Sequence, residues 1–239
     1  MNDLSRSFAP ELLAPLPDGA GHGYLENDAW WLTARAALSV KCKFLGSEIR
    51  WAGSSVLQLA CESGLVSDGL LRRGCDVTAV DTRAEMLRFA RARSAAHGYR
   101  IGYDHVARLD ALPHADGQFD IVLCDHVFDR DLEAAPLLAE IWRVLRPHGI
   151  VMFTCTRPGA MTALRLALFR GRAAPGLPRH MGRRAGMTPQ RMRRLLRDAR
   201  FEPRRFAGLA PRGIPGIGTL SYCTVDGRRP LWLGTAMKD

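Results

Sequence analysis

The sequence predicts an α/β fold, in which a mostly parallel sheet carries helices on both faces. The first observation is a series of short apolar runs of strand length, at residues 55–60, 76–80, 119–125 and 150–156. Runs that are apolar throughout are typical of strands buried on both faces. The second observation is helical periodicity between these runs, as in residues 84–97. Strands that alternate with helices of this length predict βαβ units and therefore a parallel sheet.

Apolar residues at helical spacing justify the remaining helices. A helix is expected over residues 29–45, where Gly46 ends it. A later helix has apolar residues at i, i+1, i+4, i+7 and i+8, and is expected to end at residues 146–149. These apolar residues are Leu137, Leu138, Ile141, Val144 and Leu145. Thr188 and Pro189 form an N-cap and N1 pair, which is expected to open a last helix.

The chain is expected to form one large domain over residues 29–239. Its 239 residues, of which 47% are hydrophobic, suffice to bury a full core. A weaker strand is expected near residues 101–106, and strands near residues 204–209 and 231–237 would complete the sheet. Residues 1–28 are expected to be a flexible N-terminal arm, because they are polar, rich in proline and glycine, and lack a signal-peptide h-region. Since no run of 18 apolar residues is present, we expect a cytoplasmic protein without a membrane span.

The net charge of +10 is concentrated in one segment. Residues 157–200 contain twelve arginines and one acid, Asp198, and we interpret residues 157–187 as a basic insertion in the domain. Such a patch indicates an anionic partner or surface, although a solvated arginine-rich face explains it equally well. A nucleic acid is a poor fit, because apart from His180 the segment has one aromatic ring for base stacking, Phe169.

Residues 161–184 offer a more specific hypothesis for this patch, namely contact with an anionic membrane surface. Residues 161–170 form a short apolar helix candidate edged with arginines, and further arginines follow it. A helix of this kind can bury its apolar side chains while its cations meet lipid headgroups. The alternative is a lid helix that covers the substrate and packs its apolar face on the sheet.

Residues 56–64 read VLQLACESG, a short strand followed by a tight loop. This segment resembles the first loop of class I S-adenosylmethionine-dependent methyltransferases, whose pattern is similar to V-L-D-x-G-C-G-x-G. The resemblance implies S-adenosylmethionine as cofactor, with Gln58, Ala60, Glu62 and Gly64 around it. Gln58 replaces the acid of the pattern, while Ala60 and Glu62 replace two glycines. Either Glu62 is a relocated carboxylate that takes over from the lost acid, or the loop has abandoned the ordinary cofactor geometry.

Further cofactor contacts are expected where the strands end, because open α/β sheets bind ligands at the carboxyl ends of their strands. Asp81 closes the second strand, and an acid there can accept both ribose hydroxyls of a nucleoside; a helix N-cap aspartate is the alternative. The resemblance implies that Asp110 meets the adenine edge, unless Arg108 takes that register. Asp125, which ends the run at residues 119–125, is assigned to the same cofactor site.

Several further pieces, in the same order along the chain, resemble the ubiquinone-biosynthesis O-methyltransferases. They are Trp30 and Trp31, residues 119–124 (FDIVLC), residues 145–157 (LRPHGIVMFTCTR) and residues 187–189 (MTP). The resemblance covers residues 23–238 and implies a Rossmann-like, seven-stranded class I methyltransferase fold. It also implies methyl transfer, in the form of O-methylation, to a phenolic or quinone-like small molecule.

The same family carries a Glu-x-x-Glu-His cluster after the fourth strand, which binds a divalent cation beside the substrate. The similar positions here are His126, Asp129 and Arg130. His126 is the candidate base that deprotonates a phenol, or it joins Asp129 as a ligand of a divalent cation, Mg²⁺ or Mn²⁺. Arg130 cannot ligate a metal. A histidine at a helix start and a capping aspartate are the plain structural alternative.

A second resemblance concerns the first loop. Trp30, Trp31 and residues 57–61 (LQLAC) look like the rhodoquinone-forming relatives of the quinone methyltransferases. That resemblance implies amino transfer from S-adenosylmethionine to a quinone, with a divalent metal. A third hypothesis is a catalytically silent, methyltransferase-like binding protein. Product mass separates the first two, and failure to bind an adenosyl ligand would favour the third.

Overall fold

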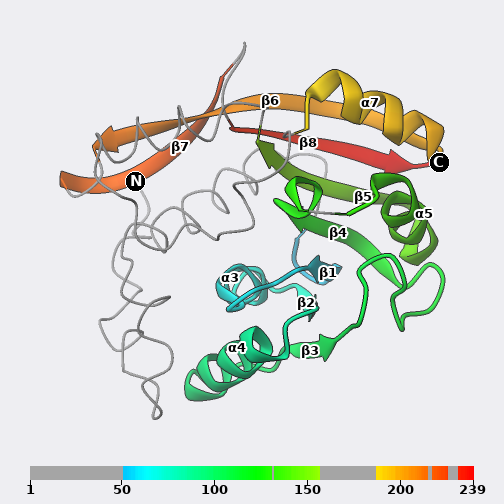
Figure 1. Cartoon of the computed structure of the whole chain (residues 1–239). Coiled ribbons are helices and arrows are strands. Elements are labelled where there is room, and N and C mark those ends of the chain that lie inside the picture. Colours follow the sequence, from blue (N-terminus) through cyan, green and yellow to red (C-terminus); the bar gives the residue numbers. More distant parts are fainter. Residues whose placement is uncertain (1–50, 131, 157–186, 215–216, 226–230) are drawn as a thin grey trace.

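The structure, a computed structural model, describes residues 51–130, 132–156, 187–214, 217–225 and 231–239 (Figure 1). The predicted N-terminal arm, the predicted helix over residues 29–45 and the basic insertion up to residue 186 lie outside this part of the chain. The same holds for the segment of the membrane-surface hypothesis, residues 161–184. Among the described helices, none is long and apolar enough to cross a membrane.

One sheet of eight strands forms the centre of the described residues, in the order β3-β2-β1-β4-β5-β8-β6-β7. The strands are β1 (Ser55–Leu59), β2 (Asp76–Asp81), β3 (Gly102–His105), β4 (Phe119–Asp125), β5 (Leu145–Thr156), β6 (Phe201–Ile214), β7 (Ile217–Val225) and β8 (Leu231–Lys238). The first five strands pair in parallel, whereas β8 lies antiparallel between β5 and β6. The predicted α/β fold class is therefore confirmed. β7 pairs antiparallel with β6 and adds an edge strand to the seven that were expected.

Helices cover both faces of the sheet, as predicted (Figure 1). They are α3 (Leu65–Leu71), α4 (Ala84–Ala96), α5 (Ala134–Val144), α7 (Pro189–Asp198) and the short 3-10 helix η2 (Val127–Asp129). On one face, α5 and α7 pack against residues such as Leu57 and Val122. On the other, α3 packs against Val56 and Ile121. Consecutive residues of β1 and β4 thus enter opposite cores, because side chains alternate along a strand.

One predicted helix end is confirmed, and another is wrong. Thr188 caps α7 as predicted, since its Oγ1 accepts the backbone N–H of Arg191 at 3.2 Å. Leu145, expected as a helical residue, is instead the first residue of β5 and pairs with Phe119. β5 then shifts register against β4, and His148 in the shifted stretch has a φ of +61°. The buried side chain of Leu145 continues the apolar period, and apolar spacing alone cannot separate a helix end from a strand that follows at once.

The strand order reverses at β1, which lies between β2 and β4. This is the topological switch point, where open α/β sheets bind their ligands at the carboxyl ends of the strands. The fold therefore places the loop after β1, the end of β2 and the segment after β4 at the same edge of the sheet.

Candidate functional site

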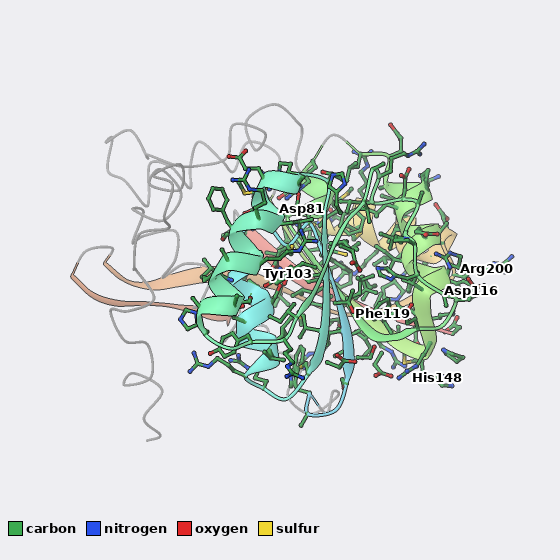
Figure 2. All side chains as sticks on the ribbon, turned by 90° about the horizontal axis from the view of Figure 1, so that it is seen from below. Asp81, Tyr103, Asp116, Phe119, His148 and Arg200 are labelled. Carbon is green, nitrogen blue, oxygen red and sulfur yellow. The ribbon has the colours of Figure 1, made fainter. Side chains whose placement is uncertain are left out.

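Three segments meet at the carboxyl ends of β1, β2 and β4. Glu62, in the loop after β1, donates its backbone N–H to Oδ2 of Asp81 at 2.9 Å. The Glu62 side chain reaches the segment after β4, where its Oε1 lies 3.3 Å from Nη2 of Arg130. Figure 2 shows Asp81 well apart from Asp116 and His148, which lie before β4 and early in β5. The structure therefore brings together the three segments that the sequence assigned to one site.

The loop after β1 has a glycine-type backbone, although two glycines of the pattern are replaced. Ala60, Glu62 and Gly64 have φ values of +52°, +52° and +73°, all in the left-handed region. A residue with a Cβ pays roughly 1–2 kcal/mol for this conformation, so Ala60 and Glu62 are strained. Gly64 could not carry a Cβ, because that atom would lie 2.5 Å from Oη of Tyr103. The three glycine positions of the pattern thus have left-handed backbone here, whichever residue occupies them.

Glu62→Gly and Glu62→Ala form a matched pair that measures this strain. Both variants remove the carboxylate, and only the alanine keeps a Cβ at a φ of +52°. We expect the glycine variant to be more stable by about 1 kcal/mol, because the relief of strain exceeds the entropy that glycine adds to the unfolded chain. Urea denaturation gives the difference in the free energy of unfolding. Equal stability, or a more stable alanine variant, would show that the backbone at this position is not strained.

Asp81 is fully buried and ties the loop to the start of α4. Its Oδ1 accepts the backbone N–H of Arg83 at 2.9 Å and the Nε–H of the same residue at 3.3 Å, while Oδ2 accepts the N–H of Glu62. The N-cap alternative for Asp81 is wrong, because Arg83 is the N-cap residue of α4. A carboxylate offers about four lone-pair sites. Three donors leave room for one ligand hydroxyl, and withdrawal of the Arg83 side chain makes room for a second.

The Glu62 carboxylate lies between two guanidinium groups. Its Oε1 is 3.4 Å from Nη2 of Arg83 and 3.3 Å from Nη2 of Arg130, and 18% of the side chain is exposed. Burial raises the pKa of the Glu62 carboxyl, and the opposing effects of Arg130 and Arg83 are smaller. The sequence suggested Glu62 as a relocated carboxylate of the cofactor loop. In the structure this carboxylate faces two arginines of the chain, Arg83 and Arg130.

Gln58 points from β1 toward α3. Its buried Oε1 accepts a hydrogen bond from Oγ of Ser67 in α3, at 2.6 Å. An ionised carboxylate at such a buried position would need stronger compensation than one hydroxyl gives. The neutral amide is thus suited to this environment, and its contact with a cofactor stays a prediction.

His126 and Asp129 form a hydrogen-bonded pair at the end of β4. Nδ1 of His126 lies 2.8 Å from Oδ2 of Asp129, and both oxygens of the buried Asp129 accept the backbone N–H of Thr156 at 3.0 Å. His126 has a left-handed φ of +53° and is the N-cap residue of η2, whereas Asp129 bonds to β5 and is not the N-cap residue of any helix in the described part of the chain. An ionised Asp129 selects the tautomer with hydrogen on Nδ1 and leaves Nε2 as the basic atom.

The described residues around His126 do not assemble a site for a divalent cation. Of the described residues, no group of three or more His, Cys, Asp and Glu side chains is placed to hold a metal ion. His126 and Asp129 direct their facing atoms at each other, and Arg130, at the third position of the motif, pairs with Glu62. The hydrogen bond with Asp129 leaves Nε2 of His126 available, and the base and metal-ligand roles of His126 both stay predictions.

Asp110 and Asp125 each bond to a neighbour. Asp110 accepts Nε and Nη2 of Arg108 at 2.8 and 2.7 Å, and this hydrogen bonding lowers the pKa of Asp110. The sequence left open whether Asp110 or Arg108 occupies the position that meets the adenine edge. In the structure these two residues are paired with each other. Asp125 accepts the hydroxyl of Thr154 at 2.8 Å. The predicted cofactor contacts of both acids stay predictions.

Sequence reasoning missed a buried network that supports the loop. Asp68 accepts Nε of Arg93 at 2.9 Å and Oγ of Ser94 at 3.0 Å, and Oγ of Ser94 lies 2.9 Å from Oη of Tyr103. The Tyr103 hydroxyl in turn lies against Gly64. The sequence signal that could have indicated this network is Asp68, the single acid in the otherwise mostly apolar helix α3 (LVSDGLL). The partners could not be read from the sequence, because they come from α4 and β3.

Comparisons with known proteins agree with this architecture. Residues 57–153 match the family model described as a methyltransferase domain. The malonyl-[acyl-carrier protein] O-methyltransferase of Salmonella typhimurium is 36% identical over 114 residues, or 48% of this chain and 43% of that protein. The ubiquinone biosynthesis O-methyltransferase of Xanthomonas euvesicatoria pv. vesicatoria is 28% identical over 126 residues, or 52% of this chain and 53% of that protein. The chain thus spans about half the length of these curated relatives.

Solved structures agree on the fold. An S-adenosylmethionine-dependent methyltransferase from Thermotoga maritima, described as a possible histamine N-methyltransferase, matches with a TM-score of 0.62 at 16% identity. The match covers 90% of this chain and 95% of that chain, and at this identity it shows the fold alone. The predicted class I methyltransferase fold is confirmed, as is the resemblance to the ubiquinone biosynthesis O-methyltransferases.

Proposed function

We propose that this protein, which has the class I methyltransferase fold, transfers a methyl group from S-adenosylmethionine to an oxygen of a phenolic or quinone-like small molecule. The observation that carries the proposal is the His126–Asp129 pair, with its 2.8 Å hydrogen bond at the carboxyl end of β4. This pair belongs to the same segment as Arg130, which contacts the loop after β1. Both relatives are named O-methyltransferases. These names support a methyl group as the group transferred and an oxygen as the acceptor atom.

The residues at the ends of β1 and β2 fit an adenosyl cofactor. Asp81 would hold the ribose hydroxyls, with the side chains of Glu62 and Arg83 moved aside. The glycine-type backbone of residues 60–64 would allow a close approach of the methionine portion. When bound, S-adenosylmethionine supplies an electrophilic methyl group on its sulfonium sulfur.

His126 would act as the general base. Because Nδ1 of His126 is directed at Asp129, Nε2 is the atom that takes the proton of the phenol as its oxygen attacks. Asp129, held by the N–H of Thr156, stabilises the imidazolium that forms. The rest of the rate enhancement would come from holding the acceptor oxygen in line with the methyl group.

Asp81→Asn tests the cofactor assignment. We expect this variant to bind S-adenosylhomocysteine at least about tenfold more weakly, because hydrogen bonds to a charged acceptor contribute roughly 1.5–3 kcal/mol. Asparagine keeps the shape of the buried side chain, so the variant is expected to fold. Isothermal titration calorimetry of the full chain measures the affinity.

Asp76→Asn is the matched control, because Asp76 is exposed at the opposite end of β2. Its affinity for S-adenosylhomocysteine should equal that of the unchanged protein. If a folded Asp81→Asn variant also kept full affinity, Asp81 would not hold the ribose. If the unchanged protein bound no adenosyl ligand, the proposed function would be wrong and the silent binding protein would be favoured.

The substituted loop supports a second candidate function, in which the cofactor is kept and another group is transferred. Gln58 and Glu62 differ from the methyltransferase pattern in charge, and Glu62 engages two arginines. Amino transfer to a quinone is the form that the loop resemblance suggests. Mass spectrometry of the product decides, because a methyl group adds one carbon and an amino group adds none.

A lipid-embedded quinone acceptor would suit a cytoplasmic protein that contacts the inner face of an anionic membrane. The basic residues 161–184 are the proposed contact, by attraction to anionic headgroups. This part of the proposal concerns residues outside the described ranges and rests on their sequence.

A further inference from the structure

The side chain of Arg130, four residues after the candidate base His126, is partly buried and has a hydrogen-bond donor that no described residue satisfies. Its side chain is 13% exposed, and among the described residues it makes one ion pair, from Nη2 to Oε1 of Glu62. Its Nε is buried and has no hydrogen-bond partner in the described part of the structure. A guanidinium carries five N–H donors, and a buried donor of a charged group left unpaired is costly. The position therefore suits an additional acceptor.

The contact between Arg130 and Glu62 is weak enough to exchange. Charge-assisted N–H···O bonds are typically about 2.7–2.9 Å long, and this contact is 3.3 Å. The same oxygen of Glu62 is shared with Arg83 at 3.4 Å. Burial also raises the pKa of Glu62, so its charged form is poorly stabilised where it lies. A ligand that offers two carboxylate oxygens to the planar fork of an arginine would be a better partner.

We propose that Arg130 is an anion-binding residue of the site, and that a ligand carboxylate replaces Glu62 as its partner. This deepens the proposed function and rests on it, because Arg130 follows His126 by one turn at the carboxyl end of β4. The carboxylate has two possible sources, the methionine portion of the adenosyl cofactor or an acid group on the aromatic acceptor. In both cases Glu62 competes with the ligand for the same cation.

Two substitutions are expected to have opposite effects on the binding of a carboxylate. Arg130→Gln removes the cation, and Glu62→Gln removes the competing charge while the side-chain shape stays. Arg88→Gln is the matched control, because Arg88 is exposed on α4. Each full-length variant is titrated calorimetrically with two pairs of probes, in each of which one member carries a carboxylate and the other carries none. The pairs are S-adenosylhomocysteine with 5′-methylthioadenosine, and 3,4-dihydroxybenzoate with catechol.

We expect Arg130→Gln to weaken one carboxylate-bearing probe by roughly tenfold or more and to leave its uncharged counterpart unchanged. Glu62→Gln should strengthen the same probe. An effect on S-adenosylhomocysteine assigns the carboxylate to the cofactor, and an effect on 3,4-dihydroxybenzoate assigns it to the acceptor. Arg130→Lys, which keeps the charge, should recover part of the affinity.

The inference is overturned if Arg130→Gln changes neither carboxylate-bearing probe, or changes both members of a pair equally. It is also overturned if the unchanged protein binds none of the four probes. Should Arg130→Gln fail to fold, Glu62→Gln decides, because unchanged binding of both carboxylates by that variant contradicts competition. Failure of the proposed function is distinguishable: neither nucleoside then binds, while the dihydroxybenzoate titration still tests Arg130.

Discussion

Replacing His126 by glutamine is expected to lower the turnover number for methyl transfer by about 10²–10⁴-fold, the usual contribution of a positioned general base. The reason is geometric. Asp129 fixes Nδ1 of His126 at 2.8 Å and is itself fixed by the N–H of Thr156, so Nε2 is held as the proton acceptor. Glutamine can keep a hydrogen bond to Asp129 but cannot take the proton. Affinity for S-adenosylhomocysteine should stay unchanged, because the imidazole acts on the acceptor.

His148→Gln is a closely matched control for this experiment. His148 is also a histidine with left-handed backbone, at a φ of +61° against +53° for His126, and it lies away from Asp81 (Figure 2). It is exposed, so its replacement should leave turnover unchanged. Asp129→Asn provides a second measurement, since an amide can favour the wrong tautomer of His126 and should also reduce turnover. If His126→Gln retained full turnover with a phenolic acceptor, His126 would not be the base.

Asp68→Ala is expected to reduce the free energy of unfolding by about 3–5 kcal/mol, because it leaves the buried charge of Arg93 without its partner. Both side chains are buried, and Nε of Arg93 lies 2.9 Å from Oδ2 of Asp68. Nη2 of Arg93 already has no hydrogen-bond partner within the described ranges, so little else nearby can compensate. Ser94 would lose its bond to Asp68 as well. Urea denaturation measures the loss.

The effect of Asp68→Ala should extend to the cofactor loop. Ser94 joins Asp68 to Tyr103, whose hydroxyl lies against Gly64. A loosened network should therefore weaken adenosyl-ligand binding in addition to stability. Asp198→Ala is the control, because Asp198 forms an exposed pair with Arg194 at 4.0 Å on α7 and should show no measurable change. If Asp68→Ala lowered the free energy of unfolding as little as Asp198→Ala does, the stabilising role of the buried Asp68–Arg93 pair would be wrong.

Local residue patterns determined the fold class and most of its elements. The mostly apolar run that became β4 was predicted with both of its ends correct, because a parallel strand covered on both faces is a near-continuous apolar run. The start of α7 was predicted because Thr188 and Pro189 are suited to the first positions of a helix whatever lies around it. The spacing of His126 and Asp129 also placed the two residues of the candidate base close together.

The tertiary structure decided the features that depend on partners distant in the sequence. Leu145 became a strand residue because Phe119 pairs with it, and β7 formed as an edge strand on β6. No local pattern distinguishes these outcomes, since apolar spacing records burial and says nothing of the element that buries a residue. The N-cap alternative for Asp81 was excluded in the same way, because Arg83 is the N-cap residue of α4, while the ribose contact of Asp81 stays a prediction.

The sequence by itself determined that an α/β sheet would bring its loops to one edge, and which loops these would be. Only the tertiary structure decided that Glu62 meets Arg130, 68 positions away, and that Tyr103 lies against Gly64. The physical reason is that strand and helix patterns depend on local backbone preference and burial. Ion pairs and close packing depend on which side chains the assembled sheet places within a few ångströms of one another.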